Sequence, residues 1–134
     1  MANEGIKNLG FHHIGLKCSD IEKSLSMYCA LGMKEVVRWG QGSGLVVMLD
    51  IGDGGRMELF ANGSDEFSAN GKWIHFAMAV EDVDAAYERA LGAVFVTKTA
   101  PKVVQLPSSP EPISINIAFV KGPDGEEVEC FRQV

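Results

Sequence analysis

The sequence predicts an α+β fold made of two βαβββ repeats, and three observations lead to it. The chain has 134 residues, the usual size of one domain. Its second half repeats the order found in its first half: an apolar strand, an acidic turn, a helix and a Leu-Gly pair. Short β-rich segments then follow each helix. We therefore expect a single domain over residues 1–134, with repeat one at about 9–62 and repeat two at about 72–134.

One helix is predicted in each repeat, directly after the first strand. In the first repeat Ser19 and Glu22 form an S-x-x-E capping box, and Gly32 is placed to end the helix. In the second repeat Asp82 is the expected cap and Gly92 the expected C-terminal glycine. Aligning the two Leu-Gly pairs makes the second helix two residues shorter than the first.

Three β-rich segments follow each predicted helix. The last two segments of each repeat are joined by an Asp-Gly turn, Asp53-Gly54 and Asp124-Gly125, as in a β-hairpin. Four of the five prolines gather in residues 100–112, which we expect to form a loop. The six expected strands cover residues 34–39, 45–51, 56–61, 94–97, 113–121 and 127–132.

Composition narrows the classes of function. A formal charge of −6 and a pI near 5.0 disfavour nucleic acid and anionic membranes as partners. No apolar run is long enough to span a bilayer, and the first ten residues lack the apolar stretch of a secretory signal, so we expect a cytoplasmic protein. The three cysteines show no C-x-x-C spacing, which predicts reduced thiols.

The first strand of each repeat carries a histidine followed by small residues on one face. Side chains alternate across a strand, so His13 shares a face with Gly15 and Lys17, and His75 shares a face with Ala77. Small neighbours leave room for a ligand beside each imidazole.

A glutamate follows the aspartate of each Asp-Gly turn by five residues, giving Glu58 and Glu129. A fold that brings equivalent strands together would gather these carboxylates with His13 and His75. Two imidazoles and two carboxylates suit a divalent Ni, Zn, Co, Mn or Fe ion. The sequence therefore predicts a metal site.

Ordinary structural roles are the alternative for each of these residues. Histidines near strand starts are commonly hydrogen-bonded structural residues, and glutamates on edge strands commonly face solvent. We interpret Glu126 and Glu127 as solvated, and His12, on the opposite face from His13, as structural. Repeat equivalence favours the metal site, since neither burial nor solubility requires His and Glu at matching places in both halves.

Two stretches of the sequence resemble a known family. HHIGLKCSDIEKSLSMYCALGMKEV resembles the opening of vicinal-oxygen-chelate proteins, and IAFVKGPDGEEVECF resembles their closing hairpin. This superfamily includes glyoxalase I, bleomycin-resistance proteins and extradiol dioxygenases. The likeness covers residues 9–132 and implies a glyoxalase/bleomycin-resistance fold.

The resemblance also implies a site and a reaction. The family's metal ligands would fall on His13, Glu58, His75 and Glu129, a set similar to that of glyoxalase I (lactoylglutathione lyase), with one divalent ion per site. Glu129, with Glu58 as its symmetry mate, would be the catalytic base, and Lys17 stands where a substrate-binding arginine is usual. The implied enzyme is a metal-dependent lyase or isomerase. It would act on an α-hydroxycarbonyl or thiohemiacetal, such as the methylglyoxal–glutathione adduct, by proton abstraction to a metal-bound enediolate.

Two other functions stay open at this point. One is an Fe(II)-dependent ring-cleaving dioxygenase that uses His13, His75 and Glu129, with Glu58 off the metal. The other is a non-catalytic binding protein for a small molecule such as an antibiotic. In every case we expect a small-molecule partner and a homodimer, with the site formed either within one chain or across two.

Overall fold

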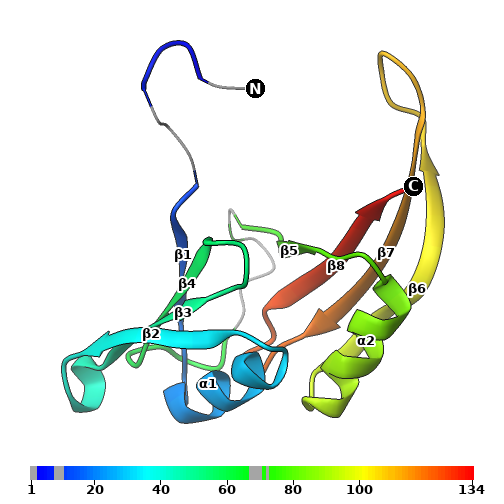
Figure 1. Ribbon diagram of the computed structural model, residues 1–134. Coiled ribbons are helices and arrows are strands. Elements are labelled where there is room, and N and C mark those ends of the chain that lie inside the picture. The colour runs from blue at the N-terminus through cyan, green and yellow to red at the C-terminus, as the bar shows by residue number, and fades with distance from the viewer. Residues whose placement is uncertain (1–2, 8–10, 67–70, 72) are drawn as a thin grey trace.

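The fold is an α+β arrangement of two βαβββ units, as the sequence predicts. The structure is a computed structural model that describes residues 3–7, 11–66, 71 and 73–134. Each unit contains one four-stranded sheet, and Figure 1 shows the two units side by side. Within the described ranges no helix is both long and apolar enough to cross a bilayer.

Both units follow the same order of elements. The first contains β1 (His13–Lys17), α1 (Ile21–Ala30), β2 (Lys34–Trp39), the short 3-10 turn η1 (Gly42–Gly44), β3 (Val46–Asp50) and β4 (Arg56–Phe60). The second contains β5 (Phe76–Ala79), α2 (Val83–Gly92), β6 (Val96–Leu106), β7 (Ile113–Lys121) and β8 (Glu127–Gln133). The sheet orders are β1-β4-β3-β2 and β5-β8-β7-β6. In each sheet the first pair is parallel and the other pairs are antiparallel.

The loop expected over residues 100–112 is wrong in its first half, because β6 continues to Leu106. Residues 102–106 pair with residues 113–117 of β7. The register shifts between Thr99 and Lys102, so Pro101 lies in an irregular part of an edge strand, where a missing N–H is tolerated. Together with β7 this segment forms the long hairpin at the upper right of Figure 1.

The N-terminal caps agree with the sequence prediction in only one of the two helices. Asp82 accepts a hydrogen bond from the backbone N–H of Ala85 at 3.0 Å and caps α2 as expected. In α1, however, the cap is Asp20, which accepts from the Lys23 N–H at 3.1 Å. The capping box predicted for Ser19 is therefore wrong, because that side chain bonds elsewhere.

The C-terminal ends of the helices also differ from the prediction. Both helices have ten residues, so the second is not shorter. Gly32 has a φ of +113° and follows α1 as expected. Gly92 lies inside the last turn of α2, and Val94, with a φ of +73°, takes the equivalent left-handed position. A β-branched residue is strained in that conformation.

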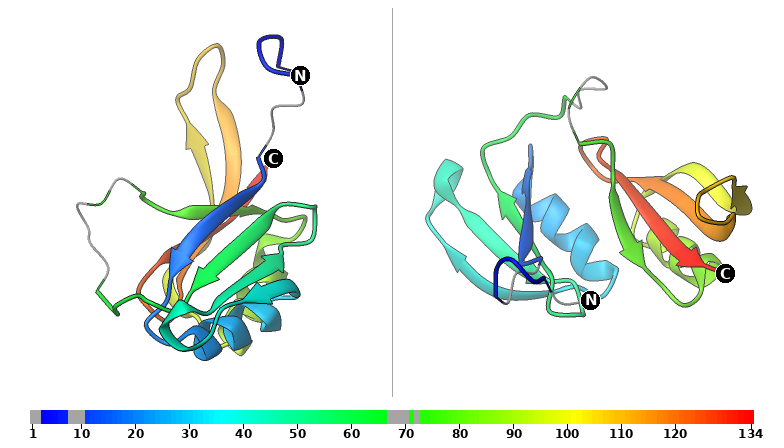
Figure 2. Two further views of the ribbon diagram at one scale, coloured as in Figure 1. Left: turned by 90° about the vertical axis from the view of Figure 1, so that its left-hand side faces the viewer. Right: turned by 90° about the horizontal axis from the view of Figure 1, so that it is seen from above.

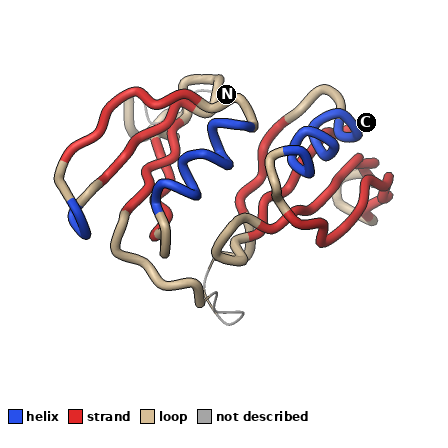
Figure 3. Tube along the Cα trace, turned by 90° about the horizontal axis from the view of Figure 1, so that it is seen from below, coloured by secondary structure: helices blue, strands red, loops and turns tan. Residues whose placement is uncertain are grey.

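Helix α1 is covered on two sides, by its own sheet and by the second unit. One core cluster joins residues of both units, and the Tyr28 ring packs edge-on against Phe95 at 5.3 Å between centroids. Figures 2 and 3 show α1 lying between the first sheet and the second unit. The apolar face of each sheet is thus turned toward the helices, and the other face stays open.

A buried polar network also joins the two units. The Ser19 N–H and hydroxyl both donate to the Asp124 carboxylate. Glu126 accepts from the Tyr28 hydroxyl at 3.0 Å and from the Asp124 N–H at 2.9 Å. The prediction that Glu126 is solvated is wrong, because it is buried against α1. Burial raises the pKa of its carboxyl, and the nearby Asp124 carboxylate adds to the rise.

Replacing Val94 by glycine should stabilise the protein. The side chain is 71% exposed, so little burial is lost, and glycine removes a left-handed strain of about 1 kcal/mol. Thermal unfolding of Val94→Gly should show a higher midpoint. The matched control is Val96→Gly, which lies in β6 without a positive φ and should lower the midpoint. A lower midpoint for Val94→Gly would refute the strain.

Glu126→Gln tests the buried carboxyl. A raised folded-state pKa means that the favourable contribution of this group is complete below its unfolded-state pKa of about 4.3 and is lost as the pH rises through the folded-state value. A neutral amide donates to the Tyr28 oxygen, accepts from the Asp124 N–H and does not titrate. Urea unfolding should therefore show Glu126→Gln gaining stability relative to wild type as the pH rises above about 4.3.

The control for this experiment is Glu88→Gln, a change at an exposed position of α2. Its stability difference from wild type should not vary over the same pH range. Parallel pH curves for Glu126→Gln and wild type would contradict a raised pKa at Glu126.

Candidate metal site

The first predicted pair of ligands comes together on the open face of the first sheet. Register places Gly15 opposite Glu58, and His13 lies one step away along β1 on the same face. His13 Nε2 is 3.2 Å from Glu58 Oε2. The imidazole is 45% exposed and the carboxylate only 12%, so the glutamate is the more buried member of the pair and the histidine lies nearer to solvent.

The second predicted pair repeats this arrangement on the second sheet. His75 Nε2 is 3.0 Å from Glu129 Oε2, with the imidazole 34% and the carboxylate 10% exposed. The edge of the Phe119 ring packs against the His75 ring at 5.2 Å between centroids. The structure therefore brings His75, directly before β5, together with Glu129 of β8, as the sequence predicts.

Two neighbours of His13 were not assigned to the site from the sequence. His12 Nδ1 lies 2.9 Å from His13 Nδ1, so His12 contacts the imidazole although its strand position suggested the opposite face. With one ring nitrogen held in this way, the other is directed to Glu58. The Phe60 ring covers Gly15, where an added Cβ would lie 3.2 Å from Cε2. The space expected beside this imidazole is thus partly filled.

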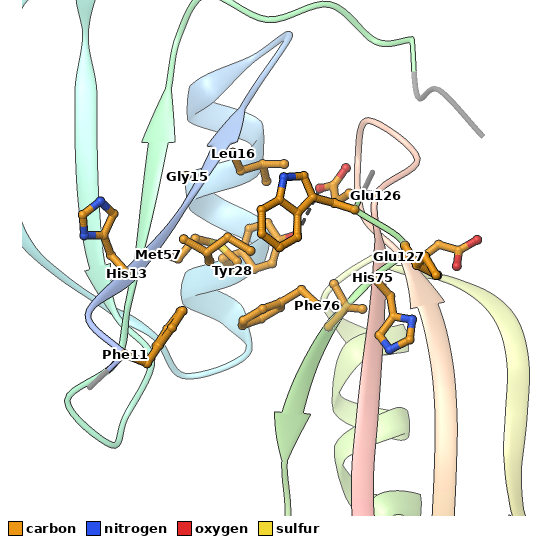
Figure 4. Close-up of a pocket in the computed structure, with 14 residues that line it drawn as sticks. Phe11, His13, Gly15, Leu16, Tyr28, Met57, His75, Phe76, Glu126 and Glu127 are labelled. Carbon is orange, nitrogen blue, oxygen red and sulfur yellow. Dashed lines mark hydrogen bonds between the residues drawn. The ribbon is translucent and has the colours of Figure 1, made fainter. Parts of the chain in front are cut away.

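One chain does not bring the two pairs together. Figure 4 shows His13 and His75 pointing away from each other, on opposite sides of a cavity of about 470 Å³ between the units. Apolar side chains such as Met57 and Phe76 line most of this cavity, with Glu126 among the few polar ones. Among the residues that the structure describes, no group of three or more His, Cys, Asp or Glu could hold a metal ion.

Each pair nevertheless fits one half of a metal site. Two donors bonded to one ion at about 2.1 Å and at right angles lie about 3.0 Å apart. The two nitrogen–oxygen distances of 3.2 and 3.0 Å match that separation. The chemistry of the donor set also suits a borderline divalent ion rather than Ca or Mg.

Other residues near the pairs have defined roles. Lys17 is exposed and shares the open face with His13, as alternation predicts. Glu127 is not freely solvated as predicted, because Lys98 Nζ lies 2.6 Å from its carboxylate. Cys18 and Cys130 are free and buried, and burial raises the pKa of both thiols. They are packing residues rather than ligands.

Comparison with known proteins identifies relatives over most of the chain. Residues 10–130 match the family model of the Glyoxalase/Bleomycin resistance protein/Dioxygenase superfamily. The chain is 30% identical to the uncharacterised protein YwbC of Bacillus subtilis (strain 168), over 90% of this chain and 95% of that protein. It is 29% identical to a probable lactoylglutathione lyase of Synechocystis sp., over 90% of this chain and 92% of that protein.

Solved structures share the fold at low identity. A glyoxylase/bleomycin resistance protein/dioxygenase domain from Frankia sp. EAN1pec superposes with a TM-score of 0.74 at 20% identity, covering 94% of this chain and 98% of that one. Glyoxalase I from Zea mays superposes with a TM-score of 0.72 at 22% identity, covering 90% of this chain and 43% of that one. These likenesses show the arrangement of elements alone.

Proposed function

The chain belongs to the Glyoxalase/Bleomycin resistance protein/Dioxygenase superfamily, and from that premise we propose that it is a metal-dependent lyase or isomerase of the glyoxalase I type. One observation carries this proposal: a His–Glu pair at ligand spacing lies at the equivalent place on the open face of each unit. The similarity to a probable lactoylglutathione lyase supports it. The substrate would be a small α-hydroxycarbonyl or thiohemiacetal.

The complete site would form between two copies of the chain. Because His13 and His75 point away from each other within one chain, His13 and Glu58 of one copy would face His75 and Glu129 of the other. A two-fold axis then makes two equivalent sites per dimer. Two features support such an association.

The first feature is that β1 and β5, which lead from the two histidines, are edge strands with free backbone groups. The second is that large apolar side chains stand exposed next to them, as on a surface that another chain covers. These are Phe11, Trp73 and Ile74.

Glutamate is the group that can move the proton in this site. A bound divalent ion would polarise the substrate carbonyl and make the neighbouring C–H bond more acidic. Glu129 would take that proton and return it to the adjacent carbon, which gives a net isomerisation. Its carboxylate is nearly buried, so water competes little for the proton. Glu58 occupies the symmetric position and is the second candidate base.

Glu129→Gln should keep the fold and lose turnover by about a hundredfold or more, the usual contribution of a general base. The assay uses the thiohemiacetal of methylglyoxal and glutathione, together with metal analysis of the purified protein. Glu88→Gln is the matched control and should keep wild-type turnover. Unchanged turnover in Glu129→Gln would remove its role as base. Bound iron together with oxygen consumption would contradict the lyase or isomerase and favour the Fe(II)-dependent dioxygenase instead.

A further inference from the structure

Arg56 lies beside the first His–Glu pair and, among the residues that the structure describes, has no ion-pair partner. Register places Arg56 directly across from His13 on β1 and from Asp50 on β3, so its side chain shares their open face. Arg56 and Glu58 are two residues apart on β4, about 7 Å along one face. Any molecule held at the His–Glu pair is therefore within reach of this guanidinium.

Within the described part of the chain Arg56 forms no ion pair, although Asp50 lies across from it on β3. Among the described residues, the Arg56 side chain makes one weak hydrogen bond, in which Nη1 donates to Met48 Sδ at 3.7 Å. The carboxylate of Asp50 accepts from the Gly52 N–H at 2.7 Å, and the described ion pairs do not include Arg56. The residue is half-buried, so its cation is partly removed from water. A partly buried guanidinium is stabilised by an anion, such as a carboxylate, that accepts two parallel hydrogen bonds from it.

Charge on this face contrasts with the molecule as a whole. The protein carries a formal charge of −6, yet Lys17 and Lys34 accompany Arg56 on the open face of the first sheet. The carboxylates there are Asp50 and Glu58, so three cations lie with two anions among the described residues of this face, with His counted as neutral. A local excess of positive charge remains for a ligand.

An apolar strip runs beside these charged groups on the same face. Register aligns Phe60 with Val46 and Val46 with Trp39, and it aligns Val37 with Met48. Trp39 is 47% exposed, so its ring is available to a ligand. Val46 and Met48 are only 8% exposed, so the accessible apolar surface of this face is provided mainly by Val37 and Trp39 on the outer strand β2.

We infer that Arg56 binds an anionic group of the substrate, so that the site takes small carboxylates with an apolar or aromatic body. The planar guanidinium can donate two parallel hydrogen bonds to a carboxylate, and the exposed side chains of Val37 and Trp39 lie on the same face for contact with the body. This inference rests on the proposed function in one respect, namely that the reacting carbon of the substrate is held at the His–Glu pair. The binding of the anion itself does not depend on turnover.

The test uses 3-phenylpropionate as the probe and its neutral amide as the comparison, measured by calorimetry on the full chain with and without added zinc. Neither compound needs turnover to bind. Wild type should bind the acid about tenfold or more tightly than the amide at low salt, since a charge-assisted bidentate contact contributes that much. In Arg56→Met this preference should vanish, while affinity for the amide stays.

Two further variants make the result unambiguous. Arg38→Met removes an arginine on the opposite face of the same sheet, where it is paired with Glu35, and should keep the preference for the acid. Arg56→Lys keeps the positive charge but cannot make the bidentate contact, so it should keep only part of the preference for the acid. This variant also provides the test if Arg56→Met fails to fold.

Equal affinity of wild type for acid and amide, or an undiminished preference in Arg56→Met, would overturn the assignment of Arg56. Either result leaves the loss of turnover in Glu129→Gln as a separate question. Conversely, loss of the acid preference in Arg56→Met would stand even if no isomerase activity were found.

Discussion

The need to bury one apolar face of each sheet is the constraint on which the rest of the structure depends. Apolar side chains of both sheets pack toward helices, and α1 is buried between its own sheet and the second unit. Strand alternation then sends the remaining side chains to the opposite, open face. Both sheets obey this rule, and Figure 4 shows His13 and His75 pointing away from each other. The packing of the core therefore keeps the two histidines apart within one chain.

Local patterns in the sequence were enough to predict that His13 lies beside Glu58 and His75 beside Glu129. The distance from His13 to Glu58 arises from neighbouring strands, and the positions of both residues follow from alternation and from the Asp-Gly turn. The same holds for His75 and Glu129. Whether the two pairs meet depends on how the units pack, and no local pattern contains that information.

The features that the sequence did not predict depend on contacts between distant parts of the chain. Ser19 does not cap its helix because its N–H and hydroxyl donate hydrogen bonds to Asp124, 105 residues away. Glu126 is buried because α1 packs over it and Tyr28 donates to it. β6 extends through a proline-rich segment because its residues 102–106 pair with residues 113–117 of β7. For Ser19 and Glu126 a partner about a hundred residues away outweighs the local preference, and for β6 the pairing within the hairpin does.

The central claim is that His13 of one copy and His75 of another bind the same ion. It is tested by mixing His13→Ala and His75→Ala chains after unfolding and refolding them together. Each variant alone lacks one histidine at both sites, but a mixed dimer has one complete site. Zinc bound after dialysis should be low for either variant alone and should recover in the mixture to about a quarter of the wild-type level, since half of the dimers are mixed and each has one intact site of two. A mixture that binds no more zinc than its separate components would contradict the account.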